Sequence, residues 1–367
     1  MIQMPWTEET APNISLEITD ACNVSCRHCY KRLTGRRKSL AEIRADLQDA
    51  MRLRPLHTVS LSGGEPTLHP ELPEIVRLVK EQGIGVFLLT NGAAFDAPLA
   101  ARLRAAGLDA VLFHLDPGQV RPDIGRVDSF AAMLPRLEEL ISLARAEGLD
   151  VSLSYTLQQT GDLPAICDFF FGQPALSFLF LARGTDLAEL YASGGRGDED
   201  GLGLGPVTEF FRERFDLPPY AAIPASDGGQ PCWISFFQPY VDDPPARSAF
   251  PFRSNGLDVA LMRLHRLATG RYVHKTSQRP GLTALRVLLN GLSTCRLLEA
   301  WRFLLRARPA SASLRHKMVV YDDGPRRNAA GEWVRCAYCP TAIVRDGRLL
   351  PCCAADHRPE TKDRQEP

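Results

Sequence analysis

The chain has 367 residues, of which 45% are hydrophobic and 23% charged, an ordinary balance for a globular protein with a large core. Its 43 basic and 43 acidic side chains give a formal net charge of zero, so no overall field favours nucleic acid or membrane. The N-terminal residues lack a secretory signal pattern, and no apolar run approaches the roughly 18 residues of a spanning helix. Ten clustered cysteines without such a signal favour metal ligation in a reducing cytoplasm over disulfides.

Strand and helix patterns alternate through the first half of the chain. The apolar runs predict strands over residues 13–19, 57–61, 84–90, 111–115, 151–157 and 177–181. Helices are predicted from Ser39 onward and over about residues 72–79, 97–106, 130–147 and 163–170. Six such alternations predict an α/β fold with a parallel sheet and right-handed crossovers. Periodicity alone leaves both a doubly wound sheet and a barrel open.

The pattern changes after the sixth predicted strand. We predict a core over residues 1–190, a Gly/Pro-rich linker over 191–230, a basic helical accessory segment over 231–335 and a cysteine-rich module over 336–367. Residues 253–317 contain eleven arginines and two lysines, against Asp258 and Glu299 as the only acids. Leucine patterns within them predict two helices, one before and one after Asn290-Gly291.

Two short motifs follow the first and second predicted strands. Cys22, Cys26 and Cys29 have the spacing C-x3-C-x2-C. Thiolates are soft ligands, suited to iron–sulfur clusters, zinc or copper(I). An iron–sulfur cluster on three cysteines keeps one iron open, and zinc held by three ligands plus water is the competing chemistry. The second strand leads into Gly63-Gly64-Glu65-Pro66, where the two glycines let backbone approach a ligand closely.

These two motifs, in this order and on adjacent strands, resemble the radical S-adenosylmethionine (SAM) superfamily. The resemblance covers about residues 13–182 and implies a partial (β/α)6 barrel of the TIM type, open on one side for substrate. It implies that Cys22, Cys26 and Cys29 hold a [4Fe–4S] cluster whose open iron binds the methionyl end of SAM. Reductive cleavage of SAM would then give a 5′-deoxyadenosyl radical that abstracts a hydrogen atom from substrate.

The resemblance also implies contacts to SAM from loops and strand ends. The candidates are Gly63, Gly64, Glu65, Asn91, Asp116, His28 and Ser154. The Gly-Gly-Glu turn would receive the SAM ammonium through backbone carbonyls and the Glu65 carboxylate. His28 stands where the family usually has an aromatic residue near adenine. For Asn91 and Asp116, contacts to SAM and simple turn or cap roles both remain open.

A second cysteine group lies near the C-terminus, in Cys336, Cys339 and Cys352. The turn Asp346-Gly347 between two apolar runs predicts a hairpin that carries Cys339 and Cys352 to one end. This arrangement looks like half of the SPASM/twitch extensions that hold auxiliary iron–sulfur clusters in many radical SAM enzymes. The fourth ligand stays open between Cys232 and Cys353, and a zinc knuckle is the alternative to a cluster.

The sequence therefore predicts a cytoplasmic, oxygen-sensitive radical SAM enzyme with two [4Fe–4S] clusters. The basic loop at residues 31–38 is a candidate docking site for an acidic flavodoxin- or ferredoxin-type electron donor, or a solvated loop. The basic accessory segment predicts an anionic small-molecule or lipid-like substrate and peripheral contact with an anionic membrane; no nucleic acid is expected. A peptide-modifying (RiPP) maturase and a non-enzymatic iron–sulfur carrier or scaffold are the alternatives.

Overall fold

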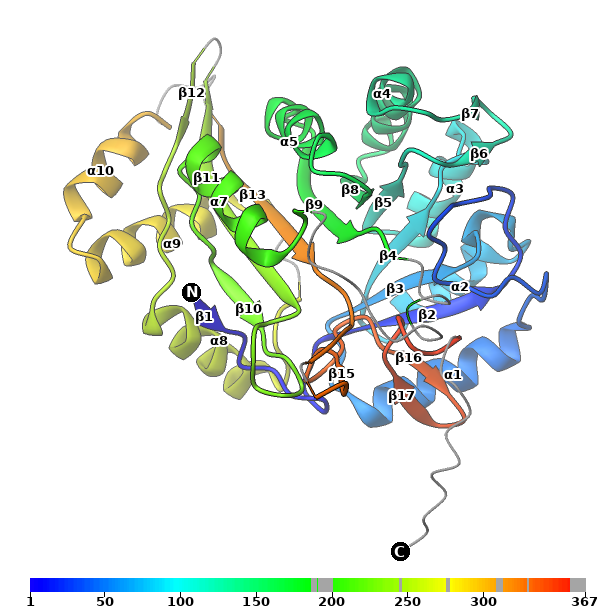
Figure 1. The fold of residues 1–367 in the computed structure, drawn as a ribbon. Helices are drawn as coiled ribbons and strands as arrows, with labels where there is room; N and C mark the ends of the chain where they lie inside the picture. Colours follow the sequence, from blue (N-terminus) through cyan, green and yellow to red (C-terminus); the bar gives the residue numbers. More distant parts are fainter. Residues whose placement is uncertain are drawn as a thin grey trace, which may run out of the picture.

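The computed structural model describes residues 1–185, 190, 201–243, 246–274, 278–307, 313–328 and 330–356. A large mixed sheet forms the centre of this described part, with helices along its outer side (Figure 1). The strand order is β1-β10-β11-β13-β9-β8-β5-β4-β3-β2, and β12 pairs with β11. No helix of the described residues is both long and apolar enough to cross a bilayer.

Six neighbouring strands form the barrel part of the sheet. They are β2 (Asn13–Thr19), β3 (Thr58–Gly63), β4 (Gly85–Thr90), β5 (Ala110–His114), β8 (Asp150–Leu157) and β9 (Leu176–Arg183). Each pairs in parallel with the next one in this series. The six strands follow one another in chain order, without the reversal that defines a doubly wound sheet. The prediction of a partial (β/α)6 barrel is therefore confirmed.

Five helices connect these strands and cover the barrel. They are α1 (Leu40–Leu53), α2 (Leu72–Lys80), α3 (Ala97–Ala106), α4 (Phe130–Ala146) and α5 (Asp162–Gly172). A 3-10 turn, η1 (Pro66–Leu68), precedes α2, and a small hairpin of β6 (Val120–Arg121) and β7 (Gly125–Arg126) precedes α4. The predicted start of α1 is confirmed by a capping box in which Ser39 and Glu42 each accept the other's backbone N–H. The apolar stripes of the helices and strands share one buried core.

The second half of the chain continues the same sheet, which corrects two of the predicted segments. The predicted linker 191–230 contains α7 (Leu204–Phe215) and β10 (Ala221–Ile223) in its described part. The predicted helical segment 231–335 contains α8 (Gly256–Thr269), α9 (Pro280–Ser293), α10 (Leu297–Leu305), and also the strands β11 (Trp233–Asp243), β12 (Ala246–Ala249) and β13 (Ser313–Asp322). Strand β13 pairs in parallel with β9, β11 runs antiparallel to β13, and β1 (Ile2–Gln3) pairs with β10. The Pro239 ring and the basic run at 315–317 hid these strands from a pattern-based prediction.

The C-terminal module returns to the first strand of the barrel. It contains the hairpin of β16 (Ile343–Arg345) with β17 (Arg348–Leu350), and the pair of β14 (Arg326–Arg327) with β15 (Trp333–Val334) precedes it. The predicted hairpin at 346–347 is confirmed, with positive φ at both Asp346 and Gly347 as a type I′ turn requires. The N–H of Ser15 donates to the carbonyl of Ala342 at 2.9 Å, so the hairpin lies directly against β2.

Candidate functional site

A cavity of about 360 Å³ lies inside the barrel. At the carboxyl ends of the strands it is lined by the cysteine loop after β2 and by Gly63 and Gly64; at the amino ends it reaches Asn13 and His274. Between these ends the wall is largely apolar and aromatic, with Phe87, Leu112, Phe178, Phe180, Trp233 and Met318 among its residues. The barrel thus encloses a site with polar groups at both ends and an apolar middle.

The three cysteines of the first motif all line this cavity. Asn91 Nδ2 lies 3.8 Å from the Cys22 sulfur, and Gln119 Nε2 lies 3.6 Å from the Cys26 sulfur. Burial raises the pKa of Cys22, and burial with the nearby Asp116 carboxylate raises that of Cys26 to about 12. Such thiols keep their protons at neutral pH unless a metal replaces them. Gln119 was not predicted, because nothing in the sequence distinguishes it from a loop residue.

The donor set fits a [4Fe–4S] cluster with one open iron. Across the described residues, no three Cys, His, Asp or Glu side chains stand close enough together to hold a single metal ion. A tetrahedral zinc site needs sulfurs about 3.8 Å apart, given its Zn–S bonds of about 2.3 Å. A cubane cluster spaces its thiolates more widely. The three cysteines that line the cavity, two of them near amide donors, supply the three thiolates that such a cluster with one open iron requires.

The two glycines after β3 are required by the close approach of the cysteine loop. A Cβ on Gly63 would collide with the carbonyl oxygen of Thr19, and one on Gly64 with that of Ala21. Gly63 also has φ 132, which side chains rarely adopt. The N–H groups of Gly64 and Glu65 donate to those two carbonyls at 2.8 and 2.7 Å. The glycine turn therefore positions the cysteine loop, and both glycines line the cavity.

The Glu65 carboxylate, predicted to receive the SAM ammonium, is bound by protein donors in the structure. Glu65 is fully buried and is not among the cavity-lining residues. One oxygen accepts from the N–H and hydroxyl of Thr67 and from the hydroxyl of Thr90; the other accepts from the N–H of Asn91 at 2.7 Å. With four protein donors, the carboxylate fixes the end of β4.

Replacing Glu65 by glutamine should therefore lower the unfolding free energy of the protein. The N–H groups of Thr67 and Asn91 donate to different oxygens of Glu65, and a glutamine has only one oxygen. One buried N–H then faces an amide N–H, which costs about 1–3 kcal/mol of unfolding free energy. Urea unfolding measures this, with exposed Glu71→Gln as the matched control. Weaker SAM binding by calorimetry with unchanged unfolding free energy would contradict a role of Glu65 in fixing the end of β4.

Asn91 lies at the end of β4 and joins the Glu65 site to the cysteine loop. Its side-chain amide donates to Asn23 Oδ1 at 2.9 Å and approaches Cys22, while its N–H donates to Glu65. Asn91 lines the cavity, and its contacts in the structure position the cysteine loop. His28 also lines the cavity, with its ring 3.4 Å from where a Cβ would stand on Gly184.

Asp116 and Ser154, both predicted site residues, are connected by a histidine that was not predicted. His114 Nε2 lies 2.9 Å from Asp116 Oδ2, and His114 Nδ1 lies 3.1 Å from Ser154 Oγ. All three line the cavity. Burial lowers the pKa of His114, but the Asp116 carboxylate outweighs this and leaves that pKa raised. In the sequence, His114 ends an apolar strand run and carries no signal of its own.

The His114–Asp116 pair predicts a pH-dependent stability. A histidine with a raised folded pKa stabilises fully below its unfolded pKa of about 6.5, and that stabilisation is lost as pH rises through the folded pKa. Asp116→Asn should therefore cost more unfolding free energy near pH 6 than near pH 9. In the His114→Gln background the same substitution should lose this pH dependence. Equal costs at both pH values in the wild-type background would show that the pair does not ionise as described.

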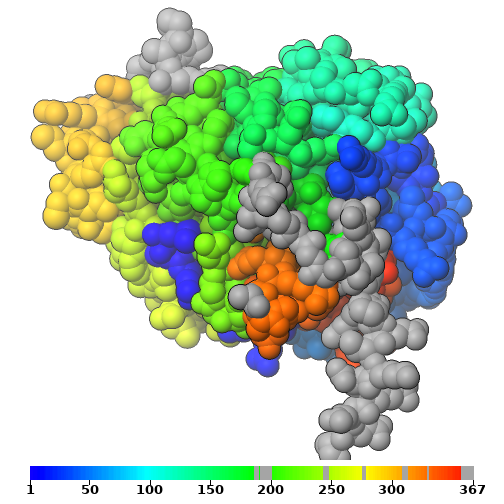
Figure 2. Space-filling view, viewed as in Figure 1, coloured from blue at the N-terminus to red at the C-terminus, as the bar shows by residue number. Residues whose placement is uncertain are grey.

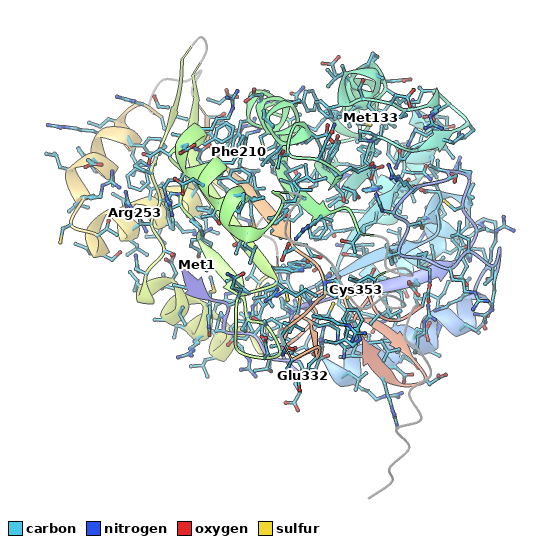
Figure 3. The ribbon with its side chains drawn as sticks, viewed as in Figure 1. Met1, Met133, Phe210, Arg253, Glu332 and Cys353 are labelled. Carbon is cyan, nitrogen blue, oxygen red and sulfur yellow. The ribbon has the colours of Figure 1, made fainter. Side chains whose placement is uncertain are left out.

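The C-terminal cysteines gather at one place beside the cavity. Cys232 is hydrogen-bonded to Cys336, and Cys339 to Cys352, with Thr341 Oγ1 3.6 Å from Cys339 and 3.2 Å from Cys352. The hydrogen bond from Cys352 lowers the pKa of Cys339 to about 6. Cys353 feels the charges of Cys339 and Cys232, so it belongs to the same group. Cys353, labelled in Figure 3, lies near the middle of the molecule beside the hairpin, and Cys352 and Cys353 line the cavity.

Within the basic loop predicted to dock an electron donor, residues 31–38, the Lys31 side chain is buried in an ion network. Its Nζ lies 3.0 Å from Glu17 and 2.9 Å from Asp356, and Arg345 reaches the same two carboxylates at 2.9 and 2.7 Å. The Lys31 side chain is only 2% exposed, so it cannot meet an electron donor. Tyr30, beside it on the cavity wall, lies within electrostatic range of both Cys29 and Cys352.

The basic accessory segment contributes His274 to the cavity wall, but not its arginines and lysines in the described residues. His274 lines the cavity and forms a 2.8 Å hydrogen bond with Thr58 Oγ1. None of the described basic side chains of residues 253–317 lines it. Several instead donate to backbone carbonyls: Arg271 to Leu56, Arg315 to Pro174, Arg296 to Pro251 and Lys317 to Phe170, Gln173 and Leu176.

Comparison with known proteins identifies the core. Residues 16–159 match the Radical SAM superfamily, so the chain contains a radical SAM core, as its two motifs predict. Fe-coproporphyrin III synthase of Methanosarcina barkeri (strain Fusaro / DSM 804) is 30% identical over 172 residues, 45% of this chain and 42% of that protein. PqqA peptide cyclase of Xanthomonas oryzae pv. oryzae (strain MAFF 311018) is 31% identical over 158 residues, 41% of this chain and 42% of that protein.

The solved structure of Streptococcus suis SuiB bound to precursor peptide SuiA aligns with a TM-score of 0.41 and 15% identity. The alignment covers 49% of this chain and 41% of SuiB. This chain thus spans less than half the length of each of these three proteins.

Proposed function

We propose that the protein is a radical SAM enzyme that cleaves SAM reductively and abstracts a hydrogen atom from a substrate held in the barrel. The observation that carries this proposal is that Cys22, Cys26 and Cys29, the Gly63-Gly64 turn and the apolar barrel interior line one cavity. When bound, a [4Fe–4S] cluster supplies the electron that cleaves the sulfonium C–S bond, which yields methionine and a 5′-deoxyadenosyl radical. A mere electron carrier would have no use for an enclosed apolar cavity beside its cluster.

The residues of the chain bind and orient SAM. Backbone groups of the Gly63-Gly64 turn receive its ammonium, since the Glu65 carboxylate is saturated by protein donors. The His28 ring packs against adenine, and Asp116 accepts from the ribose hydroxyls. The aromatic wall beyond them holds the substrate and keeps water away from the radical.

The C-terminal cysteines hold an auxiliary [4Fe–4S] cluster, with Cys232 as the fourth ligand. This assignment follows from the two hydrogen-bonded thiol pairs, which together contain Cys232, Cys336, Cys339 and Cys352. Cys353 lies near Cys339 and Cys232 but stands outside these pairs.

The favoured substrate is a peptide that places an apolar side chain in the cavity. The PqqA peptide cyclase relative supports this class, and the cavity wall suits an apolar group. The basic residues that line the cavity, Lys31 and Arg183, are both paired with acids, so the wall does not select for an anionic substrate. The modification made after hydrogen abstraction is a separate question of substrate chemistry.

A small-molecule substrate is the second candidate, because Fe-coproporphyrin III synthase is also a relative. Deuterium incorporation into 5′-deoxyadenosine separates the two classes, since the radical takes hydrogen from the substrate it meets. Label transferred from a deuterated candidate peptide supports the peptide class, and label transferred only from a small metabolite overturns it.

An external electron donor and a reducing cytoplasm complete the proposal. All ten cysteines are free thiols, consistent with such a compartment. With Lys31 buried, the exposed Arg32 and Arg37 of the same loop are the groups left to meet an acidic flavodoxin or ferredoxin.

Iron content and SAM cleavage test both cluster assignments together. The wild type, reconstituted without oxygen, should hold about eight irons, as two [4Fe–4S] clusters require. Replacing Cys22, Cys26 and Cys29 by alanine should remove half of this iron and abolish SAM cleavage. Cys336→Ala with Cys339→Ala, or Cys232→Ala alone, should remove the other half.

Two substitutions serve as controls in this series. Cys353→Ala and the exposed Cys295→Ala should leave all the iron in place. Release of zinc from the Cys336 and Cys339 variant, with its iron unchanged, would contradict the auxiliary cluster. Loss of iron in Cys353→Ala but not in Cys232→Ala would exchange their roles.

A further inference from the structure

Helices α8, α9 and α10 expose an unusual number of large apolar side chains. These helices make up one side of the molecule, coloured yellow-green to gold in Figure 2. Ten of the fifteen exposed large apolar side chains of the described residues lie on them: Leu261, Leu264, Leu267, Leu282, Leu285, Leu292, Leu297, Leu298, Trp301 and Leu305. Their exposed fractions run from 38% at Leu261 to 84% at Leu267. Ordinary surfaces scatter such residues singly rather than concentrating them.

On each helix these side chains form a stripe. Leu261, Leu264 and Leu267 of α8 are three residues apart, and Leu297, Trp301 and Leu305 of α10 are four apart. Such spacings put side chains on one face of a helix. Helix α8 has no buried residue at all, so its apolar stripe has no partner within the described part of the chain.

The opposite sides of α9 and α10 are firmly packed, so the exposed stripes are not a sign of loose helices. Gly291 lies inside α9, rather than between two helices as the sequence suggested. Only glycine fits there, because a Cβ would stand 2.5 Å from that of Ala300 on α10. Val287 and Phe303 are buried in the same cluster. Asn255 caps α8 and donates to Ser293 at 2.8 Å, which attaches α8 to the end of α9.

The exposed charges around these stripes have nearly one sign. The exposed basic residues among described residues 253–306 are Arg253, Arg263, Arg266, Arg279, Arg302 and Arg306. Glu299 is the only exposed acid in the same described stretch, and it is paired with Arg296. The inner basic residues of the segment, such as Arg271 and Arg315, are bound to backbone carbonyls instead. The positive charge that faces solvent is therefore concentrated beside the apolar stripes.

We propose that this basic–apolar face, formed by the exposed residues of α8, α9 and α10, docks on an anionic phospholipid membrane. Leucines and Trp301 insert at the boundary of headgroups and acyl chains, while the arginines meet lipid phosphates and carboxylates. The expected anionic partner thus meets the protein on this face rather than in the cavity. The proposal does not depend on SAM cleavage, so each can fail without the other.

Charge argues against the other occupants of such a face. A two-fold dimer would place the same basic surface against itself, with like charges in contact. Nucleic acid would use aromatic side chains to stack on bases, and Trp301 is the only aromatic among the ten exposed apolar residues. An anionic lipid surface satisfies both the positive charge and the leucines.

Vesicle co-sedimentation tests the proposal with the full chain and its clusters. The wild type should bind vesicles of phosphatidylcholine with phosphatidylserine, bind pure phosphatidylcholine far more weakly, and lose binding as salt rises from about 0.1 to 1 M. Arg263→Gln, Arg279→Gln and Arg302→Gln together should weaken binding to the anionic vesicles roughly a hundredfold. Leu267→Ser, Leu298→Ser and Trp301→Ser together should weaken it at least about tenfold.

A matched variant with Arg44→Gln, Arg102→Gln and Met51→Ser, exposed residues of α1 and α3, should bind as the wild type does. Unchanged iron content and SAM cleavage show that each variant is folded. Equal binding to neutral and anionic vesicles, or no binding by the wild type, overturns the proposal. So does a wild-type dimer in analytical sedimentation that the leucine and tryptophan substitutions convert to monomer, because the face would then cover a second copy.

Discussion

The structure depends on a buried ion network that joins the two ends of the chain. Lys31, next to the cysteine loop, and Arg345, on the C-terminal hairpin, share Glu17 and Asp356. Burial disfavours the charged forms of Lys31 and Asp356, but their contacts with neighbouring groups outweigh this effect. The pKa of Asp356 is therefore lowered and that of Lys31 is raised. The attraction is therefore complete between roughly pH 4 and pH 10, above the unfolded pKa of the acid and below that of the lysine. Removing one member of such a buried network typically costs about 3–5 kcal/mol.

This network explains why cysteines more than 300 residues apart face one cavity. It fixes the hairpin against β2, so Cys352 and Cys353 lie on the wall that Cys22, Cys26 and Cys29 also line. Strand β13 has the matching effect on the other side, because its parallel pairing with β9 continues the barrel wall and brings Met318 and Asp322 to the cavity. The cavity is thus built by the core and the C-terminal half together, rather than by the core with an appended module.

The sequence predicted what local pattern determines. Strand β2 has the predicted bounds, and the Asp346-Gly347 hairpin formed because its turn chemistry is local. Prediction from the sequence failed where the partners of a side chain are distant in the chain. Lys317 looks like a surface lysine, yet it is 2% exposed because the carbonyls of Phe170, Gln173 and Leu176 receive its charge. The pattern likewise gave no indication of the contacts of Glu65 with Asn91 and of Lys31 with Asp356, because these partners come from other elements.

The central claim is that SAM binds at the cluster of the first cysteine motif and not at the auxiliary cluster. Electron paramagnetic resonance of the reduced protein, with and without SAM, tests this directly. In the Cys336→Ala, Cys339→Ala variant, which keeps only the first cluster, SAM should change the signal because it binds the open iron. In the Cys22→Ala, Cys26→Ala, Cys29→Ala variant the remaining signal should ignore SAM. A signal that SAM changes only in the second variant, or in neither, would contradict the account.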